Sequence, residues 1–144
     1  MPDLRRVVYG SSTPVVLNAE AVADILRVSR RNNAADGITG ALLYDDGNVL
    51  QVLEGPAEAV ARTYGRIQDD PRHRRVLTFL DRPAEERMFP DWSMGLVRAD
   101  ALSDEDRAGV RSMREAGTPA HGAVRHLLTS FREMAERQPT SARL

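Results

Sequence analysis

The segment ITGALLYDDGNVLQVLEG, residues 38–55, constrains the fold more than any other part of the sequence. Two apolar runs flank Asp46-Gly47, and an Asp-Gly pair between apolar runs is a strong signal for a tight β-hairpin turn. The sequence therefore predicts two antiparallel strands, at about residues 38–45 and 48–54.

Two helices and three further strands are predicted around this hairpin. The first helix begins after Asn18, a good N-cap residue, and ends around Asn32, Asn33 and Gly37. Its apolar residues recur with the spacing of one helix face. The second helix starts near Pro56, because the first turn of a helix tolerates a residue without an N–H group. Short apolar runs predict strands at 4–9, 74–80 and 91–97.

The predicted order of elements is β-α-β-β-α-β, followed by a fifth strand. This order is typical of an α+β ferredoxin-like fold, in which two helices pack on one face of an antiparallel or mixed sheet.

The last third of the chain predicts two more helices. Segment 103–117 opens with Ser103 and Asp106 in a capping-box pattern and ends at Gly117. The final helix, within 120–137, carries an apolar stripe that must pack against another apolar surface. The sequence leaves two alternatives open, the free face of the sheet or a partner protein. The stripe consists of Val124, Leu127, Leu128, Phe131 and Met134.

Composition excludes several classes of protein. The 20 basic and 21 acidic residues give a formal net charge of −1, which argues against direct nucleic-acid binding. No cysteine is present, so disulfides and thiolate chemistry are excluded. There is no signal-peptide core and no run of 18 apolar residues, so we expect a cytoplasmic protein without a membrane segment.

Gln51 is an uncharged amide within an aliphatic strand, and an unpaired buried amide is costly. The first and third strands are central neighbours in this fold, so Tyr9 and Gln51 are expected side by side, where they can form a hydrogen bond. The amide then has donor and acceptor capacity left over. A planar ligand between the two helices, with Ile25 and Ile67 as apolar walls, would use that capacity.

A metal site is not expected. Asp69, Asp70 and His73 lie close in sequence, but helix capping and salt bridges with the neighbouring arginines Arg72, Arg74 and Arg75 explain this cluster better.

The chain resembles a BLUF domain, the blue-light sensors using flavin. The resemblance rests on VVYGSS, ILRVSRRNNAADGITGALLYDDGNVLQVLEGP, RIQDDPRHRRV and RMFPDWSMGL, which occur in this order between residues 4 and about 97. It implies a flavin-binding photosensory domain at 1–98, a helical extension at 99–138 that acts as a cap or as an oligomer or partner surface, and a tail at 139–144.

The resemblance also assigns roles to individual residues. It implies that Tyr9 and Gln51 are the photoactive pair and that Asn33 binds the edge of the flavin ring. The remaining flavin-binding residues it implies are Ile25, Asn32, Arg66, Ile67, Asp70 and His73. Ser29 is implied as a supporting hydroxyl, and Trp92 and Met94, in the last strand, as the signal relay. Arg30 and Arg31 are expected to be variable surface residues.

The function implied is that of a blue-light photoreceptor, not an enzyme, with FAD as the preferred cofactor and FMN or riboflavin as alternatives. Light drives electron and proton transfer from the tyrosine to the flavin, and the glutamine returns either rotated or as its imidic tautomer. The last strand and the C-terminal helices then relay the change to a separate protein. The resemblance is to short proteins that form homo-oligomers and carry no output domain. The alternative is a flavin-free ferredoxin-like protein-interaction module.

Overall fold

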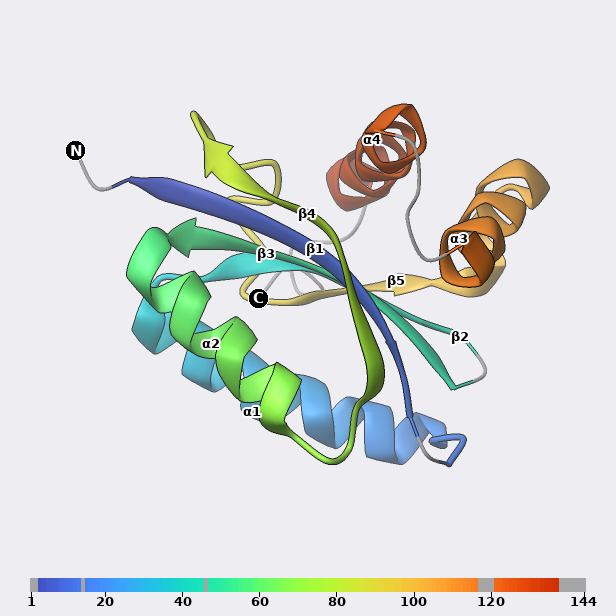
Figure 1. Ribbon diagram of the computed structural model, residues 1–144, viewed down its shortest axis with the longest axis horizontal. Helices are drawn as coiled ribbons and strands as arrows, with labels where there is room; N and C mark the ends of the chain where they lie inside the picture. The colour runs from blue at the N-terminus through green and yellow to red at the C-terminus, as the bar shows by residue number, and fades with distance from the viewer. Residues whose placement is uncertain (1–2, 14, 46, 117–120, 138–144) are drawn as a thin grey trace.

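The five strands form one mixed sheet in the order β4-β1-β3-β2-β5, with a pair of helices on each face (Figure 1). The computed structural model describes residues 3–13, 15–45, 47–116 and 121–137. The elements are β1 (Leu4–Ser12), α1 (Ala19–Asp36), β2 (Thr39–Asp45), β3 (Asn48–Pro56), α2 (Ala57–Asp69), β4 (Arg74–Ala84), β5 (Gly95–Arg98), a 3-10 helix (Ala99–Ala101), α3 (Asp104–Ala116) and α4 (His121–Arg137).

The sheet has the predicted ferredoxin-like topology with an added fifth strand. β1 is antiparallel to β3 and to β4, and β2 is antiparallel to β3. β5 runs parallel to β2 at one edge. Helices α1 and α2 lie together on one face, whereas α3 and α4 lie on the other (Figure 1).

The ends of α1 follow from its capping residues. The Asn18 side chain accepts a hydrogen bond from the Ala21 N–H group at 2.8 Å, as expected of an N-cap. At the other end Gly37 adopts the left-handed conformation with φ of 72°, which suits glycine. Asn32 and Asn33 lie inside the last turns of the helix, and the helix ends at Asp36.

The hairpin forms where the sequence predicts it. β2 and β3 pair from Thr39↔Glu54 to Asp45↔Asn48, and Gly47 has a φ of 85°. Asp46, the first residue of the predicted turn pair, lies outside the described residues.

The largest differences from the prediction are at three strand boundaries. β1 continues through the GSS segment to Ser12 because this segment pairs with the start of β3. β4 extends to Ala84 because it pairs along the whole of β1. β5 starts only at Gly95, four residues later than predicted, because the carbonyl groups of Ser93 and Met94 accept hydrogen bonds from side chains of α1. Trp92 and Met94 therefore precede the last strand.

Two hydrophobic cores lie on opposite faces of the sheet, as the alternation along β1 requires. Val7 and Tyr9 belong to the core under α1 and α2, whereas Val8 belongs to the core under the C-terminal helices. The α4 stripe packs into this second core through Val124, Leu127, Leu128 and Phe131, so it covers the free sheet face. The side chain of Met134, together with Gly117 and residues 138–144, lies outside the described residues.

Glu54 is a fully buried carboxylate in β3 that fastens the connection between β4 and β5. It accepts hydrogen bonds from the Arg6 Nε group at 2.9 Å and from the Phe89 backbone N–H group at 2.6 Å. A buried charge is tolerated when it is paired in this way. The connection is thereby fixed to the central strands before it reaches Trp92.

Gly95 lets the Trp92 ring lie directly on the backbone. A Cβ atom at this position would lie 1.7 Å from Trp92 Cε3, and the ring cannot move aside because Trp92 is only 2% exposed. We expect Gly95→Ala to lower the free energy of unfolding by about 2–3 kcal/mol, as overpacked cores do. Gly65→Ala, at an open helical position, should instead raise it by up to about 1 kcal/mol.

Urea denaturation followed by circular dichroism measures both changes. Equal stability of the Gly95→Ala and Gly65→Ala variants would contradict the close contact between Trp92 and Gly95.

Candidate functional site

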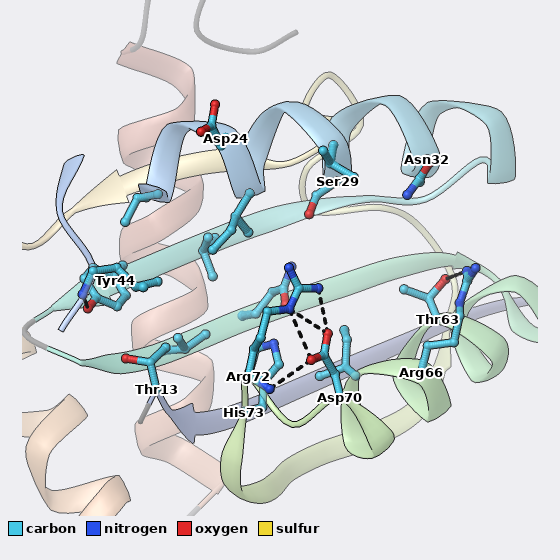
Figure 2. Close-up of a pocket in the computed structure, with 18 of the residues that line it drawn as sticks. Thr13, Asp24, Ser29, Asn32, Tyr44, Thr63, Arg66, Asp70, Arg72 and His73 are labelled. Carbon is cyan, nitrogen blue, oxygen red and sulfur yellow. Dashed lines mark hydrogen bonds and ion pairs between the residues drawn. The ribbon is translucent and has the colours of Figure 1, made fainter. Parts of the chain in front are cut away.

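A cavity of about 790 Å³ lies between α1 and α2, over β2 and β3 (Figure 2). Its walls are mostly apolar, with Ile25 and Val28 from α1 and Ile67 from α2. Polar side chains reach it from both helices and from the turn after α2. Of the residues that the sequence analysis singled out, it is lined by Ile25, Ser29, Asn32, Asn33, Gln51, Arg66, Ile67, Asp70 and His73.

Tyr9 and Gln51 are direct partners across β1 and β3, as the sequence predicts. The Tyr9 hydroxyl donates a hydrogen bond to Gln51 Oε1, and Gln51 Nε2 donates to Met94 Sδ at 3.2 Å. Tyr9 is fully buried behind the cavity wall, while Gln51 is part of that wall. Since an amide nitrogen has two N–H groups, one donor of Gln51 remains in addition to these two bonds.

Burial controls the protonation of the groups around Tyr9. Removal from water raises the pKa of the Tyr9 phenol far above its usual range, so the group is neutral. The centroid of the Tyr9 ring lies 5.2 Å from the centroid of the Tyr64 ring and 6.3 Å from that of the His73 ring. Burial also lowers the pKa of His73, whose Nδ1 lies 2.8 Å from Ser11 Oγ. Burial is the largest cause of the raised pKa of Tyr9, and the negative charge of Asp70 adds to it.

The two asparagines of α1 differ in their surroundings. Asn33 is buried and donates from Nδ2 to the Ser93 carbonyl at 2.9 Å. This bond fixes the amide and leaves one N–H group and the Oδ1 acceptor for other partners. Asn32 is exposed on the rim of the cavity, near the C-terminal end of α1 (Figure 2).

The turn after α2 brings charged groups to the cavity. Asp70 accepts hydrogen bonds from the Arg72 backbone N–H group at 2.9 Å and from its guanidinium at 2.6 Å (Figure 2). This contact lowers the pKa of Asp70 to about 2, and so the carboxylate is ionised at neutral pH. Arg66 contacts Thr63 at 3.3 Å and Asp36 at 3.7 Å. Of the salt bridges that the sequence analysis expects in this cluster, the structure shows the one between Asp70 and Arg72.

Trp92 and Met94 do not line the cavity, and they point to opposite faces of the sheet. Met94 lies in the core under α1 and α2, in contact with Gln51. Trp92 lies in the other core, stacked against Phe89 with 6.0 Å between the ring centroids. The expectation that both belong to the last strand is wrong, because their segment is irregular and comes before β5.

Sequence reasoning missed the contact made by Arg30. Its Nε donates to the Met94 carbonyl at 2.8 Å, and the residue is only partly exposed, in contrast to the expected surface role. The spacing of Leu26, Arg30 and Asn33 along one helix face is a signal that could have indicated this inward position.

Comparison with known proteins agrees with this geometry. A sequence model of the family described as "Sensors of blue-light using FAD" (BLUF) matches residues 4–95. The photoactivated adenylate cyclase subunit beta-like protein FB of Euglena gracilis is 36% identical over 101 residues, which are 69% of this chain and 12% of that protein. The chain thus spans about an eighth of the length of the curated relatives it matches.

Two solved structures are similar over most of this chain. A bacterial light-regulated adenylyl cyclase matches with a TM-score of 0.71 and 32% identity, covering 78% of this chain and 34% of the other. BlrB, a BLUF protein in its dark state, matches with a TM-score of 0.72 and 29% identity, covering 96% of this chain and 99% of the other. The chain belongs to the BLUF family of blue-light sensors using FAD.

Proposed function

We propose that this chain is a non-enzymatic blue-light photosensor that binds a flavin non-covalently between α1 and α2. FAD is the preferred cofactor, and FMN and riboflavin are the alternatives. The observation that carries the proposal is the continuous contact from Tyr9 to Gln51 and on to Met94, which meets the cavity at Gln51.

The cavity fits a flavin ring in size and in chemistry. Its volume of about 790 Å³ is in the range of small-molecule sites, which measure roughly 300–1,000 Å³. Ile25 and Ile67 offer apolar surface from opposite helices, which suits the two faces of a planar ring. Asn33 and Gln51 offer spare amide donors and acceptors, which suit a ring edge that carries carbonyl and N–H groups. Arg66 and Arg72 also line the cavity and bring positive charge to it, which suits a more polar tail.

The flavin, when bound, supplies absorption of blue light and an excited state that is a strong oxidant. Tyr9 holds its proton at the phenol oxygen, and Gln51 Oε1 is the acceptor of that hydrogen bond. Because burial raises the pKa of Tyr9, the phenol would not ionise alone; it would release its proton towards Gln51 Oε1 as its electron passed to the excited flavin, and it would regain both afterwards. The net effect on the protein is a changed hydrogen-bond arrangement at Gln51.

That change acts directly on Met94. A methionine sulfur accepts hydrogen bonds and cannot donate them, so a Gln51 amide turned the other way would lose its bond to Met94 Sδ. The imidic tautomer would likewise alter the groups that Gln51 presents to its partners. Either form changes the free-energy difference between two arrangements of the segment that carries Met94 by roughly 1 kcal/mol for each net hydrogen bond. That is enough to shift the populations when the two arrangements are close in free energy.

The signal leaves through the segment that carries Trp92 and Met94, since this segment contacts both cores. Trp92 packs into the core that α4 covers, so α4 is the element through which a separate partner protein would sense the change. We propose that the sensor acts on a separate protein partner and that it forms a homo-oligomer. The balanced charge supports a protein partner over nucleic acid, and we propose a cytoplasmic location.

The flavin-free interaction module is not favoured by any observation. This alternative requires that the apolar stripe of α4 is free to bind a partner. The stripe residues Val124, Leu127, Leu128 and Phe131 instead pack into the core of this chain. No helix in the described part of the chain combines the length and apolar character needed to cross a membrane.

The purified protein should be yellow and should show a reversible red shift of its flavin absorption under blue light. Chromatography of the released cofactor identifies it as FAD, FMN or riboflavin. A preparation that takes up none of these three flavins would refute the proposed function.

Tyr9→Phe should keep the flavin but lose the red shift, because it removes the hydroxyl that Gln51 accepts from. Tyr64→Phe is the matched control, since the Tyr64 hydroxyl contacts Thr78 instead. Light-minus-dark absorption spectra of the two variants measure the difference. A full red shift in Tyr9→Phe would remove the role proposed for this residue.

Asn33→Ala should weaken flavin binding roughly thirtyfold, the effect of two hydrogen bonds at about 1 kcal/mol each. Gln68→Ala is the control, because Gln68 is an exposed α2 residue outside the cavity lining. Fluorescence titration of the flavin-free protein with riboflavin and with FAD measures both affinities. Unchanged affinity in Asn33→Ala would place the ring edge elsewhere.

The red shift should persist at alkaline pH. A free tyrosine ionises near pH 10, but burial raises the pKa of Tyr9, so the neutral phenol should remain the dominant form above that pH. Spectra recorded from pH 7 to pH 10 should have equal light-induced amplitude, with circular dichroism to verify folding. A loss of amplitude centred near pH 8 or 9 in folded protein would contradict a raised pKa.

A further inference from the structure

Three consecutive backbone carbonyl groups, those of Trp92, Ser93 and Met94, accept hydrogen bonds from three residues, one in β2 and two in α1. The Gly40 N–H group of β2 donates to the Trp92 carbonyl at 2.9 Å. The Asn33 amide donates to the Ser93 carbonyl at 2.9 Å, and Arg30 Nε donates to the Met94 carbonyl at 2.8 Å. We call these three residues the 92–94 segment.

The three donors differ in their relation to the flavin cavity. Gly40 is part of the sheet, and Asn33 lines the cavity. Arg30 does not line it, but faces a separate cavity of about 580 Å³ between α1 and β5, which Leu96 and Arg98 also line. A change at Arg30 can therefore alter the 92–94 segment without touching the bound flavin.

Met94 is held at both of its ends. Gln51 Nε2 contacts its sulfur, and Arg30 Nε contacts its carbonyl oxygen. Hydrogen bonds from a charged donor are stronger than those between neutral groups. Arg30 and Asn33 are also one turn apart on α1, so a single rigid helix binds two successive carbonyl groups. A change in the Gln51 contact must work against these bonds before the segment can move.

We propose that Arg30 is a positioning residue that stabilises the dark arrangement of the 92–94 segment through the Met94 carbonyl. It thereby sets how far, and for how long, a change at Gln51 is transmitted to Trp92. This inference rests on the proposed function. It assigns the regulation of the response to a side chain that has no contact with the chromophore site.

The test compares Arg30→Met with Arg31→Met in the flavin-loaded full-length protein. Methionine keeps most of the apolar stem and removes the guanidinium donors, so the variant isolates the hydrogen bond from the packing of the stem. Arg31 is exposed and adjacent on the same helix, which makes it the matched control. Trp92 is the single tryptophan of the chain, so its fluorescence reports on this segment alone.

In the dark, Arg30→Met should make Trp92 more accessible to quenching by acrylamide, whereas Arg31→Met should match the original protein. The dark flavin spectrum and the size of the red shift should be unchanged in both variants. Thermal return to the dark state should be roughly fivefold slower in Arg30→Met, the factor that corresponds to one net hydrogen bond. Identical quenching and identical return rates in the two variants would overturn the proposal.

The dark quenching measurement separates this proposal from the proposed function. If the original protein binds flavin but shows no red shift, the photosensor function fails, while the acrylamide result still decides whether Arg30 holds the segment. If Arg30→Met does not fold, Arg30→Lys replaces it. Lysine keeps the charge but lacks a donor at the Nε position. Arg30→Lys should therefore also increase the acrylamide quenching of Trp92 and slow the thermal return to the dark state, both to a smaller extent than Arg30→Met. Arg30→Lys behaving as the Arg31 control would overturn the proposal.

Discussion

The pairing of Tyr9 with Gln51 across β1 and β3 is the constraint on which the site depends. Side chains alternate between the faces of a strand, so a shift of β1 by one residue in this register would turn Tyr9 to the opposite face while Gln51 stayed in place. Tyr9 would then enter the core under α4, and Val8 would take its place in the core under α1 and α2. The hairpin turn at Gly47 fixes the position of β3 against β2, whereas the register of this buried hydrogen bond is set by the pairing of β1 with β3, from Leu4↔Pro56 to Ser12↔Asn48.

The irregular backbone before β5 gives the molecule a connection between its two cores. In a regular strand, residues 92 and 94 would point to the same face, because side chains repeat every second residue. Here Met94 lies under α1 and α2, while Trp92 lies under α4. The 92–94 segment therefore contacts the Gln51 amide on one side of the sheet and, on the other, the core that Val124 helps to close. A regular β5 starting at residue 91 could not contact both.

The sequence predicts those features that local chemistry determines. An Asp-Gly pair specifies the hairpin, Asn18 and Gly37 specify the ends of α1, and the amide in β3 indicates a polar partner. The contact between Arg30 and Met94 joins residues 64 positions apart, and its formation depends on a side chain replacing a ladder hydrogen bond. No local sequence pattern around residue 91 indicates that a side chain replaces this ladder hydrogen bond. This explains why the start of β5 and the inward position of Arg30 were predicted wrongly, although the order of elements is correct.

The 92–94 segment combines stabilising bonds with a destabilising feature. Its three carbonyl groups are satisfied, but the buried Trp92 Nε1 donor has no hydrogen-bond partner among the residues that the structure describes. An unsatisfied buried donor costs about 1–3 kcal/mol. This cost is of the same order as the bonds from Arg30 and Asn33, and it therefore offsets part of their stabilising effect. A segment balanced in this way is one that the loss of a single amide–sulfur contact can shift, which is the size of signal that Gln51 provides.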